Sequence, residues 1–413
     1  MNADFHGDIL IESGRIEAVG PGLPVELDAI SVDAAGKWVF PGLVDMHVHL
    51  RVPGGEDSET IETGLKAAIA GGVTTVGAMP NTTPPIDSPQ IVSDLISAAS
   101  SLDLARCIPV PCVTRGRAGE HLVDFHKLHE AGATAFSDDG SPVHDSGLLL
   151  QAMETVSEFN GVIIEHPEVA ELSGGSINQG LIAGELGIRG IPECAETVDV
   201  ARCLEIANSC AGHLHLTHLS SPRSIELVRS DCFRSAGVTV DVTPHHLILD
   251  ETAVLEHESM AKMNPPLRSC ESRSGLLAMV KKGMVDAIAS DHAPHAMVRK
   301  RKSLEDAAFG IIGLETLLPL TIEVLYAESG MPLLQILGLL TKGPARILRI
   351  PEPGLTVGDK ADIVLYNPDI EYSLHETGIF SKSENTPFLH RKLKGKVEAV
   401  WMGRLVYRDG QFA

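Results

Sequence analysis

Positive charge is scarce in this chain of 413 residues: 33 lysines and arginines face 55 aspartates and glutamates, and the formal net charge is −22. This deficit argues against nucleic-acid binding, which needs a basic surface, and against docking on anionic lipid. No apolar run reaches the ~18 residues that a membrane span requires. The first residues are acidic and lack the pattern of a secretory signal. We therefore expect a protein that binds neither nucleic acid nor membrane.

Paired cysteines are also lacking. The seven cysteines are scattered, and none belongs to a Cys-x-x-Cys pair. An odd, scattered set without a secretory signal is typical of reduced thiols, so we expect a cytoplasmic protein. The composition, 44% apolar and 21% charged, is that of an ordinary folded chain and excludes global disorder. Eighteen histidines are many for this length, and they cluster.

Eight short apolar or β-branched runs occupy the middle of the chain, and helix-like segments such as 58–70 and 88–100 separate most of them. Alternating strands and helices are typical of βαβ units and a parallel sheet. Eight such units suit a (β/α)8 barrel, with a doubly wound open sheet as the alternative. The runs are 43–50, 74–79, 107–113, 133–138, 161–166, 213–219, 238–243 and 286–290.

Both ends of the chain are predicted to be β structure. Residues 9–11 and 15–19 flank a Ser13-Gly14 turn, and residues 361–366, 397–401 and 405–407 are strand-like. We therefore predict an α/β protein with two parts. One is a distorted (β/α)8 TIM barrel over 42–350, and the other is a small β-sandwich domain that 1–41 and 351–413 form together.

Two histidines, His47 and His49, end the first predicted barrel strand. Residues two apart on a strand point to the same face, so both imidazoles can bind one divalent ion; the alternative is a pair of buried structural histidines. Polar residues also end four later strands, and at a barrel mouth all of them would converge. These are Ser137-Asp138-Asp139, Glu165-His166, Thr217-His218 and Asp291-His292 with His295. Their joint occurrence predicts a metal-dependent active site.

Alternation along the sixth run suggests which histidine faces the mouth. His218 has the parity of the two leucines of this run, whereas His213 and His215 have the opposite parity. We predict that His213 and His215 lie on the outer face of the strand, packed against helices. His245 and His246 are expected in a loop near the mouth.

Several strings resemble the class I dihydroorotases of the amidohydrolase superfamily. The first strand end, Asp45-Met46-His47-Val48-His49-Leu50-Arg51, is the general amidohydrolase pattern, and the other strings are more specific. They are Leu50-Arg51-Val52-Pro53-Gly54, Met79-Pro80-Asn81-Thr82, Phe136-Ser137-Asp138-Asp139-Gly140, Met263-Asn264-Pro265-Pro266-Leu267-Arg268, Asp291-His292-Ala293-Pro294-His295 and Gly313-Leu314-Glu315-Thr316. The resemblance extends over nearly the whole chain.

The resemblance implies a zinc enzyme that reversibly hydrolyses the cyclic amide of (S)-dihydroorotate to N-carbamoyl-L-aspartate in pyrimidine biosynthesis. It implies two zinc ions, bridged by a carboxylate and a hydroxide that attacks the ring amide carbonyl. The implied ligands are His47, His49 and Asp291 for the first ion, His166 and His218 for the second, and Asp139 for both. Asp291 is also the implied acid and base that moves the proton to the leaving nitrogen.

The resemblance also implies how the substrate is held. Arg51 is expected to grip its carboxylate with two parallel hydrogen bonds, which lysine cannot do. The implied substrate-binding residues are His49, Arg51, Asn81, Asn264, His295, Phe309 and Gly310. For Asn81 and Asn264, capping of a turn next to proline is an equal interpretation of the sequence alone.

The sequence departs from the family at Val52, where an acid is usual, and at Asp57-Ser58-Glu59, where a lysine is common. We interpret this as a salt bridge whose two residues were replaced together; altered specificity and a loop arranged around a partner are the alternatives. Dihydropyrimidinases and allantoinases share the barrel but bridge their metals with a carbamylated lysine, and the stretch 133–140 contains no lysine. A non-catalytic scaffold for aspartate transcarbamoylase would have lost ligands, and all six are present here. We expect a homodimer or a complex with transcarbamoylase.

Overall fold

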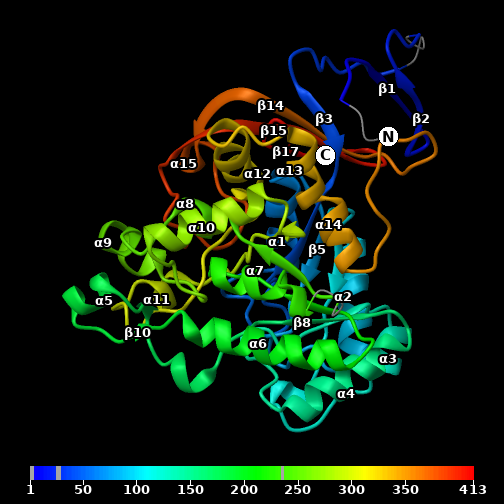
Figure 1. The fold of residues 1–413 in the computed structure, drawn as a ribbon. Helices are drawn as coiled ribbons and strands as arrows, with labels where there is room; N and C mark the ends of the chain where they lie inside the picture. Colours follow the sequence, from blue (N-terminus) through cyan, green and yellow to red (C-terminus); the bar gives the residue numbers. More distant parts are fainter. Residues whose placement is uncertain (1–3, 25–28, 234–236) are drawn as a thin grey trace.

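The computed structural model describes residues 4–24, 29–233 and 237–413. Eight short strands occupy its centre, one within each of the eight predicted runs or shifted from it by a residue (Figure 1). They are β4 (Leu43–Val48), β5 (Val73–Ala78), β6 (Arg106–Pro109), β7 (Ala135–Phe136), β8 (Val162–Glu165), β11 (Leu214–Leu216), β12 (Thr239–Val242) and β13 (Ala287–Ile288).

The eight strands close into a barrel. Three form the parallel sheet β4-β5-β6, and five form the parallel sheet β7-β8-β11-β12-β13. A parallel bridge between Val48 and His292 joins the first strand to the chain just after the last one. At the other seam, the Ser137 amide donates to the Pro111 carbonyl at 2.9 Å. Because hydrogen bonds run around the whole ring, the distorted barrel is confirmed and the open doubly wound sheet is wrong.

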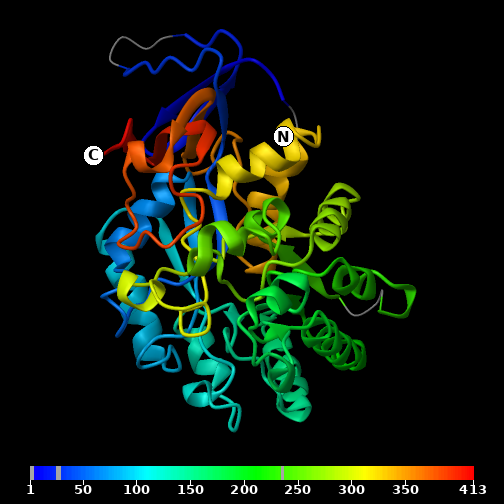
Figure 2. The same ribbon diagram turned by 90° about the vertical axis from the view of Figure 1, so that its left-hand side faces the viewer.

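Helices cover the outside of the barrel (Figures 1 and 2). Side chains set where they begin: Thr60 and Thr63 form a capping box at the start of α1, and Asp145 accepts from two backbone amides at the start of α4. The covering helices are α1 (Ile61–Ala70), α2 (Pro89–Ser101), α3 (Phe125–Glu130), α4 (Ser146–Ser157), α6 (Cys194–Ser209), α7 (Pro222–Val228), α10 (Cys270–Lys281), α12 (Leu317–Thr321) with its π-helical continuation η5 (Ile322–Ala327), α13 (Leu333–Leu340) and α14 (Lys342–Ile347).

Shorter elements lie in the connections. They are η1 (Arg115–Arg117), η2 (Ala170–Leu172), β9 (Ile177–Asn178), α5 (Leu181–Leu186), β10 (Gly190–Ile191), η3 (Asp231–Phe233), α8 (Pro244–Ile248), α9 (Ala253–His257), η4 (Glu258–Ala261), α11 (Met297–Lys300) and α15 (Leu374–Thr377). Among the described residues, no helix has the length and apolarity that crossing a bilayer demands. All seven cysteines are free thiols.

Apolar side chains sort to the two sides of the barrel wall. The outer set fills the layer between strands and helices, with Leu65 of α1 and Leu204 of α6 among its members. The inner set fills the barrel below its mouth, and includes Met46, Ile164 and, from α14, Ala345. Most of the strands are therefore buried on both faces, which explains why they are nearly continuous apolar runs in the sequence.

A β domain packs against the covering helices α1 and α12 and lies at the top of Figure 1. Its antiparallel sheet has the order β3-β14-β15-β16-β17, so a strand that precedes the barrel pairs with strands that follow it. The strands are β3 (Trp38–Pro41), β14 (Asp362–Ser373), β15 (Lys392–Met402), β16 (Leu405–Arg408) and β17 (Gln411–Phe412). The predicted hairpin, β1 (Asp8–Glu12) and β2 (Arg15–Gly20), packs on this sheet through Ile16, Ile363 and Trp401. The domain boundaries near 41 and 350 stay a prediction.

Candidate metal centre and active site

The six side chains predicted as metal ligands meet at the carboxyl ends of the barrel strands. None of the six residues is more than 6% exposed. The residues and their elements are His47 in β4 and His49 just after it, Asp139 after β7, His166 after β8, His218 after β11 and Asp291 after β13. Four imidazoles and two carboxylates therefore share one buried space.

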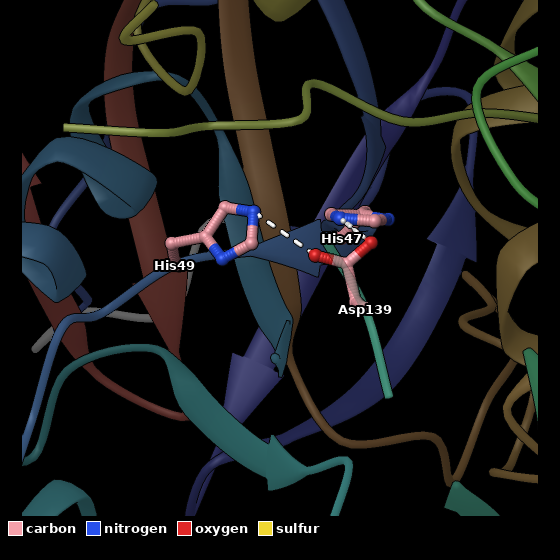
Figure 3. Close-up of side chains that lie close together, drawn as sticks. All are labelled: His47, His49 and Asp139. Carbon is pink, nitrogen blue, oxygen red and sulfur yellow. Dashed lines mark ion pairs between the residues drawn. The ribbon is translucent and has the colours of Figure 1, made fainter. Parts of the chain in front are cut away.

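Asp139 lies at the centre of this space (Figure 3). Its Oδ1 is 3.2 Å from His47 Nε2, and its Oδ2 is 3.5 Å from His49 Nε2. On the other side, Oδ1 is 3.7 Å from His218 Nε2 and 3.9 Å from His166 Nδ1. The ligand atoms therefore form two groups that share Asp139. Asp291 lies with the first group, because its Oδ1 is 3.3 Å from His49 Nε2.

The donor atoms fit divalent metal ions. His47 Nε2 and Asp139 Oδ1 are buried without a hydrogen-bond partner in the described part of the chain. Such atoms are costly unless something else satisfies them. Imidazole nitrogens and carboxylate oxygens are ligands that zinc accepts, and one carboxylate between two groups can bridge two ions. The centre thus has the composition of a binuclear metal site.

Opposite charges inside the centre offset the effect of burial. Burial lowers the pKa of His47, but the Asp139 and Asp291 carboxylates outweigh it and raise this pKa to about 9. Burial raises the pKa values of Asp139 and Asp291, but the facing imidazoles bring both below the usual value for aspartate. Without a metal, a proton on His47 supplies part of the positive charge that the carboxylates require. A bound cation would take over this role.

Hydrogen bonds behind the ligands fix which imidazole nitrogen faces the centre. Thr217 Oγ1 donates to Asp241 Oδ2 at 2.8 Å and accepts from His47 Nδ1 at 2.9 Å. With the proton on Nδ1, the lone pair of His47 Nε2 points toward the other ligands. Asn81 does the same for His49, because its Oδ1 lies 2.7 Å from His49 Nδ1 and can only accept. Asn81 therefore orients a ligand in addition to its predicted role toward substrate.

Sequence reasoning missed Asp241. This fully buried carboxylate accepts from the Thr217 hydroxyl and the His215 ring on Oδ2, and from the His218 amide on Oδ1. A signal was present in the seventh run, where polar residues at 239, 241 and 243 alternate with valines. In a strand buried on both faces, such alternation marks the side that faces a polar site.

The predicted faces of the sixth strand are wrong. Leu214 and Leu216 pack in the outer cluster, and the fully buried His215 points into the barrel, where its Nε2 lies 2.7 Å from Asp241 Oδ2. His218 has the parity of the leucines, but its φ of +38° turns its side chain back to the mouth. His213 precedes the strand and is only partly buried.

Arg51 and His295, two of the predicted substrate-binding residues, lie together beside the first ligand group. Arg51 Nε donates to the Pro294 carbonyl at 3.1 Å, and Arg51 Nη2 is 3.3 Å from His295 Nε2. Burial lowers the pKa of Arg51 to about 10, so Arg51 stays charged at neutral pH. Burial and the Arg51 charge lower the pKa of His295 to about 3, so His295 is neutral. The Phe309 carbonyl lies 2.7 Å from His295 Nε2.

Asn264 lies beside the second ligand group, where its Nδ2 is 3.3 Å from His166 Nε2. The loop that carries Asn264 is supported by His246, whose Nε2 is 3.0 Å from the Pro265 carbonyl. His245 and His246 are both buried and lie in the short helix α8 rather than in the expected loop. His246 thus supports the loop of Asn264.

Residues 57–59, which depart from the family pattern, contact the connection that follows the last barrel strand. Ser58 Oγ accepts from the Ala296 amide at 3.2 Å, and Glu59 Oε2 lies 3.2 Å from His292 Nε2. Burial raises the pKa of Glu59, but its contact with His292 reverses this effect and lowers it. Val52 packs partly buried against the main core. None of these positions is a ligand of the proposed metals.

Comparison with known proteins shows to which family the chain belongs. The sequence profile of the dihydro-orotase-like family matches residues 36–224, and that of the amidohydrolase family matches residues 199–404. A dihydroorotase of Anaplasma phagocytophilum is 41% identical over 98% of this chain and 92% of its own length, and one of Aquifex aeolicus is 40% identical over 99% and 96%. The chain belongs to the dihydroorotase family.

Solved structures of hydantoinases and dihydropyrimidinases resemble this member of the dihydroorotase family in fold. The L-hydantoinase of Arthrobacter aurescens superposes with a TM-score of 0.85 at 23% identity, and covers 98% of this chain and 93% of its own. The dihydropyrimidinase of Brevibacillus agri superposes with a TM-score of 0.82 at 22% identity, and covers 100% and 94%. These structures show a shared fold, whereas the sequence relatives at about 40% identity are dihydroorotases.

Proposed function

We propose that this chain hydrolyses the cyclic amide of (S)-dihydroorotate to N-carbamoyl-L-aspartate, and closes the ring in the reverse direction. The observation that carries this proposal is the pairing of the Asp139-centred ligand groups with Arg51 beside the first of them. A fixed cation next to the ligands favours a ring that bears a carboxylate over neutral rings such as hydantoin or dihydrouracil. Membership of the dihydroorotase family supports the same reaction.

We infer that the centre holds two zinc ions. The proposed ligands are His47, His49 and Asp291 for one ion, His166 and His218 for the other, and Asp139 for both. When bound, zinc would polarise the amide carbonyl and lower the pKa of water.

Asp291 is the proposed acid and base. Its carboxylate stays ionised at neutral pH because the neighbouring imidazoles lower its pKa despite burial. It can therefore accept a proton from the attacking water while the new C–O bond forms. The same proton then passes to the ring nitrogen as the C–N bond breaks, and ring closure follows the same steps in reverse.

Arg51 is the proposed carboxylate anchor. Its Nε is engaged by the Pro294 carbonyl, and this hydrogen bond fixes the plane of the guanidinium while the terminal nitrogens can still donate. The neutral His295 beside it adds no second cation, so the subsite suits a single carboxylate. Asn81 and Asn264 lie next to ligand histidines on the two sides of the centre.

The test is hydrolysis of dihydroorotate by the purified chain, with zinc quantified on the same sample. We expect about two zinc ions per chain and turnover of dihydroorotate but not of hydantoin, dihydrouracil or allantoin. Turnover of a neutral ring alone would overturn the proposed substrate. A sample that takes up no zinc and has no turnover would favour the scaffold interpretation. Homodimerisation, or a complex with aspartate transcarbamoylase, stays a prediction.

A further inference from the structure

The polypeptide between β14 and β15 leaves the β domain and reaches the barrel mouth. We call residues 380–388 the mouth segment. Its Phe380 amide donates to Glu315 Oε1 at 2.8 Å, and its Lys382 amide donates to Glu59 Oε1 at 3.0 Å. The side chains at 381, 383, 385, 386 and 388 are buried. The mouth segment therefore packs against the connections that follow the barrel strands, although it belongs to the C-terminal part of the chain.

Asn385, in this segment, is fully buried and contacts the backbone on either side of Pro294 and at Gly310. Its Oδ1 accepts from the His295 amide at 2.9 Å, and its Nδ2 donates to the Ala293 and Gly310 carbonyls, each at 3.0 Å. Two carbonyls need donors and one amide needs an acceptor, so the orientation of the Asn385 amide group is determined by its neighbours. Aspartate has the same shape, but it has an oxygen in place of Nδ2 and therefore offers no donor there.

The groups that Asn385 holds form the backbone around the anion subsite. Ala293 and His295 flank Pro294, whose carbonyl accepts from Arg51 Nε. The Gly310 carbonyl follows Phe309, whose own carbonyl contacts His295 Nε2. These two stretches touch directly, since a Cβ on Gly310 would lie 2.5 Å from the Ala293 Cβ.

A second buried group holds one of these stretches. The Lys300 ammonium donates to the Gly310 carbonyl at 2.7 Å and to the Lys262 carbonyl at 2.7 Å. Lys300 itself is fully buried. The Gly310 carbonyl is thus held by the barrel through Lys300 and by the C-terminal segment through Asn385. Asn385 joins this carbonyl to the backbone on both sides of Pro294.

We propose that Asn385 is a positioning residue for the anion subsite of Arg51 and His295, so that the C-terminal β domain completes the active site. This inference rests on the proposed function. Asn385 acts through the backbone at 293–295 and 310 and not through the metal ligands. A small displacement of Arg51 weakens substrate binding strongly, because paired hydrogen bonds to a carboxylate depend on geometry.

Asn385→Asp is the test, since it keeps the shape and turns a carboxylate oxygen toward two carbonyls. We expect the KM for dihydroorotate to rise about 10- to 100-fold, with kcat within about threefold of wild type and zinc per chain unchanged. Ser383→Ala is the matched control in the same segment. It loses a hydrogen bond to the Ser58 carbonyl, 2.6 Å in length, and should leave KM within about twofold.

Hydrogen exchange gives a measurement that does not depend on turnover. Amides in the stretches 293–296 and 309–312 should exchange faster in Asn385→Asp than in wild type, and those of β12 should not. If wild type does not hydrolyse dihydroorotate, the proposed function fails, and the exchange result still decides the role of Asn385. Unchanged KM and exchange, or loss of zinc, would overturn the inference. Asn385→Ser, which leaves room for water, serves if the aspartate variant does not fold. Failure of both variants to fold would assign Asn385 to stability and also overturn it.

Discussion

Replacing Thr217 by valine tests whether the hydrogen bonds of its hydroxyl group orient the His47 ring toward the metal centre. Valine has nearly the shape of threonine, so the change removes a hydroxyl and leaves the packing almost intact. It deletes the acceptor that lies 2.9 Å from His47 Nδ1 and the donor that lies 2.8 Å from Asp241 Oδ2. His47, Thr217 and Asp241 are fully buried, so bulk water does not replace the lost partner. An unsatisfied buried donor of this kind costs about 1–3 kcal/mol.

The affinity of the first ligand group for zinc should therefore fall about 10- to 100-fold, as for other residues that orient metal-bound histidines. Competition between the protein and a zinc chelator of known affinity measures this change. Thr239→Val is the matched control. Thr239 Oγ1 contacts His215 Nδ1 at 2.8 Å, and His215 reaches His47 only through Asp241 and Thr217 in this chain of hydrogen bonds. We expect less than about a threefold change there. Wild-type affinity in Thr217→Val would refute the idea that this chain of hydrogen bonds orients His47.

Three further predictions concern the proposed centre. Arg51→Lys should raise the KM for dihydroorotate at least about tenfold, because a point charge cannot form the paired hydrogen bonds, and steady-state kinetics with an unchanged KM would place Arg51 outside the site. Asp291→Asn should lower kcat at least about 100-fold while most zinc remains by atomic absorption, and near-normal turnover would contradict its role as acid and base. The pKa of His47 is raised to about 9 in the metal-free chain, so zinc must displace its proton below that pH. Zinc affinity measured by chelator competition should therefore rise about tenfold per pH unit between pH 6 and 8, whereas a flat profile would remove His47 from the ligands.

Backbone strain coincides with the proposed site. Arg51, His218 and Asp291 have φ values of +58°, +38° and +48°, in a region that residues with a Cβ rarely adopt. Each such residue costs on the order of 1–3 kcal/mol unless its surroundings hold it. For His218, the amide is held by Asp241 Oδ1 at 2.8 Å. The strands thus end in strained turns that direct side chains to the mouth, which regular alternation would not do.

Much of this architecture follows from the sequence alone. Strands buried on both faces must be apolar runs, and helices between them must bring the strands parallel, so the eight runs predicted the barrel. Parallel strands bring their carboxyl ends to one mouth. For that reason, polar residues at five strand ends could be expected to meet before any contact was known.

Only the tertiary structure decided how the side chains are aimed. Alternation on the sixth run selected His218 for a reason that proved wrong, because a turn at positive φ, and not the parity of the strand, directs its side chain. Asp241 serves the centre through Thr217, and a contact of this kind between neighbouring strands leaves no short-range pattern. Asn385 lies 90 residues from the amide of His295 that it holds. Local periodicity reflects burial along one element, whereas the orientation of a site depends on hydrogen bonds between elements that are distant in the sequence.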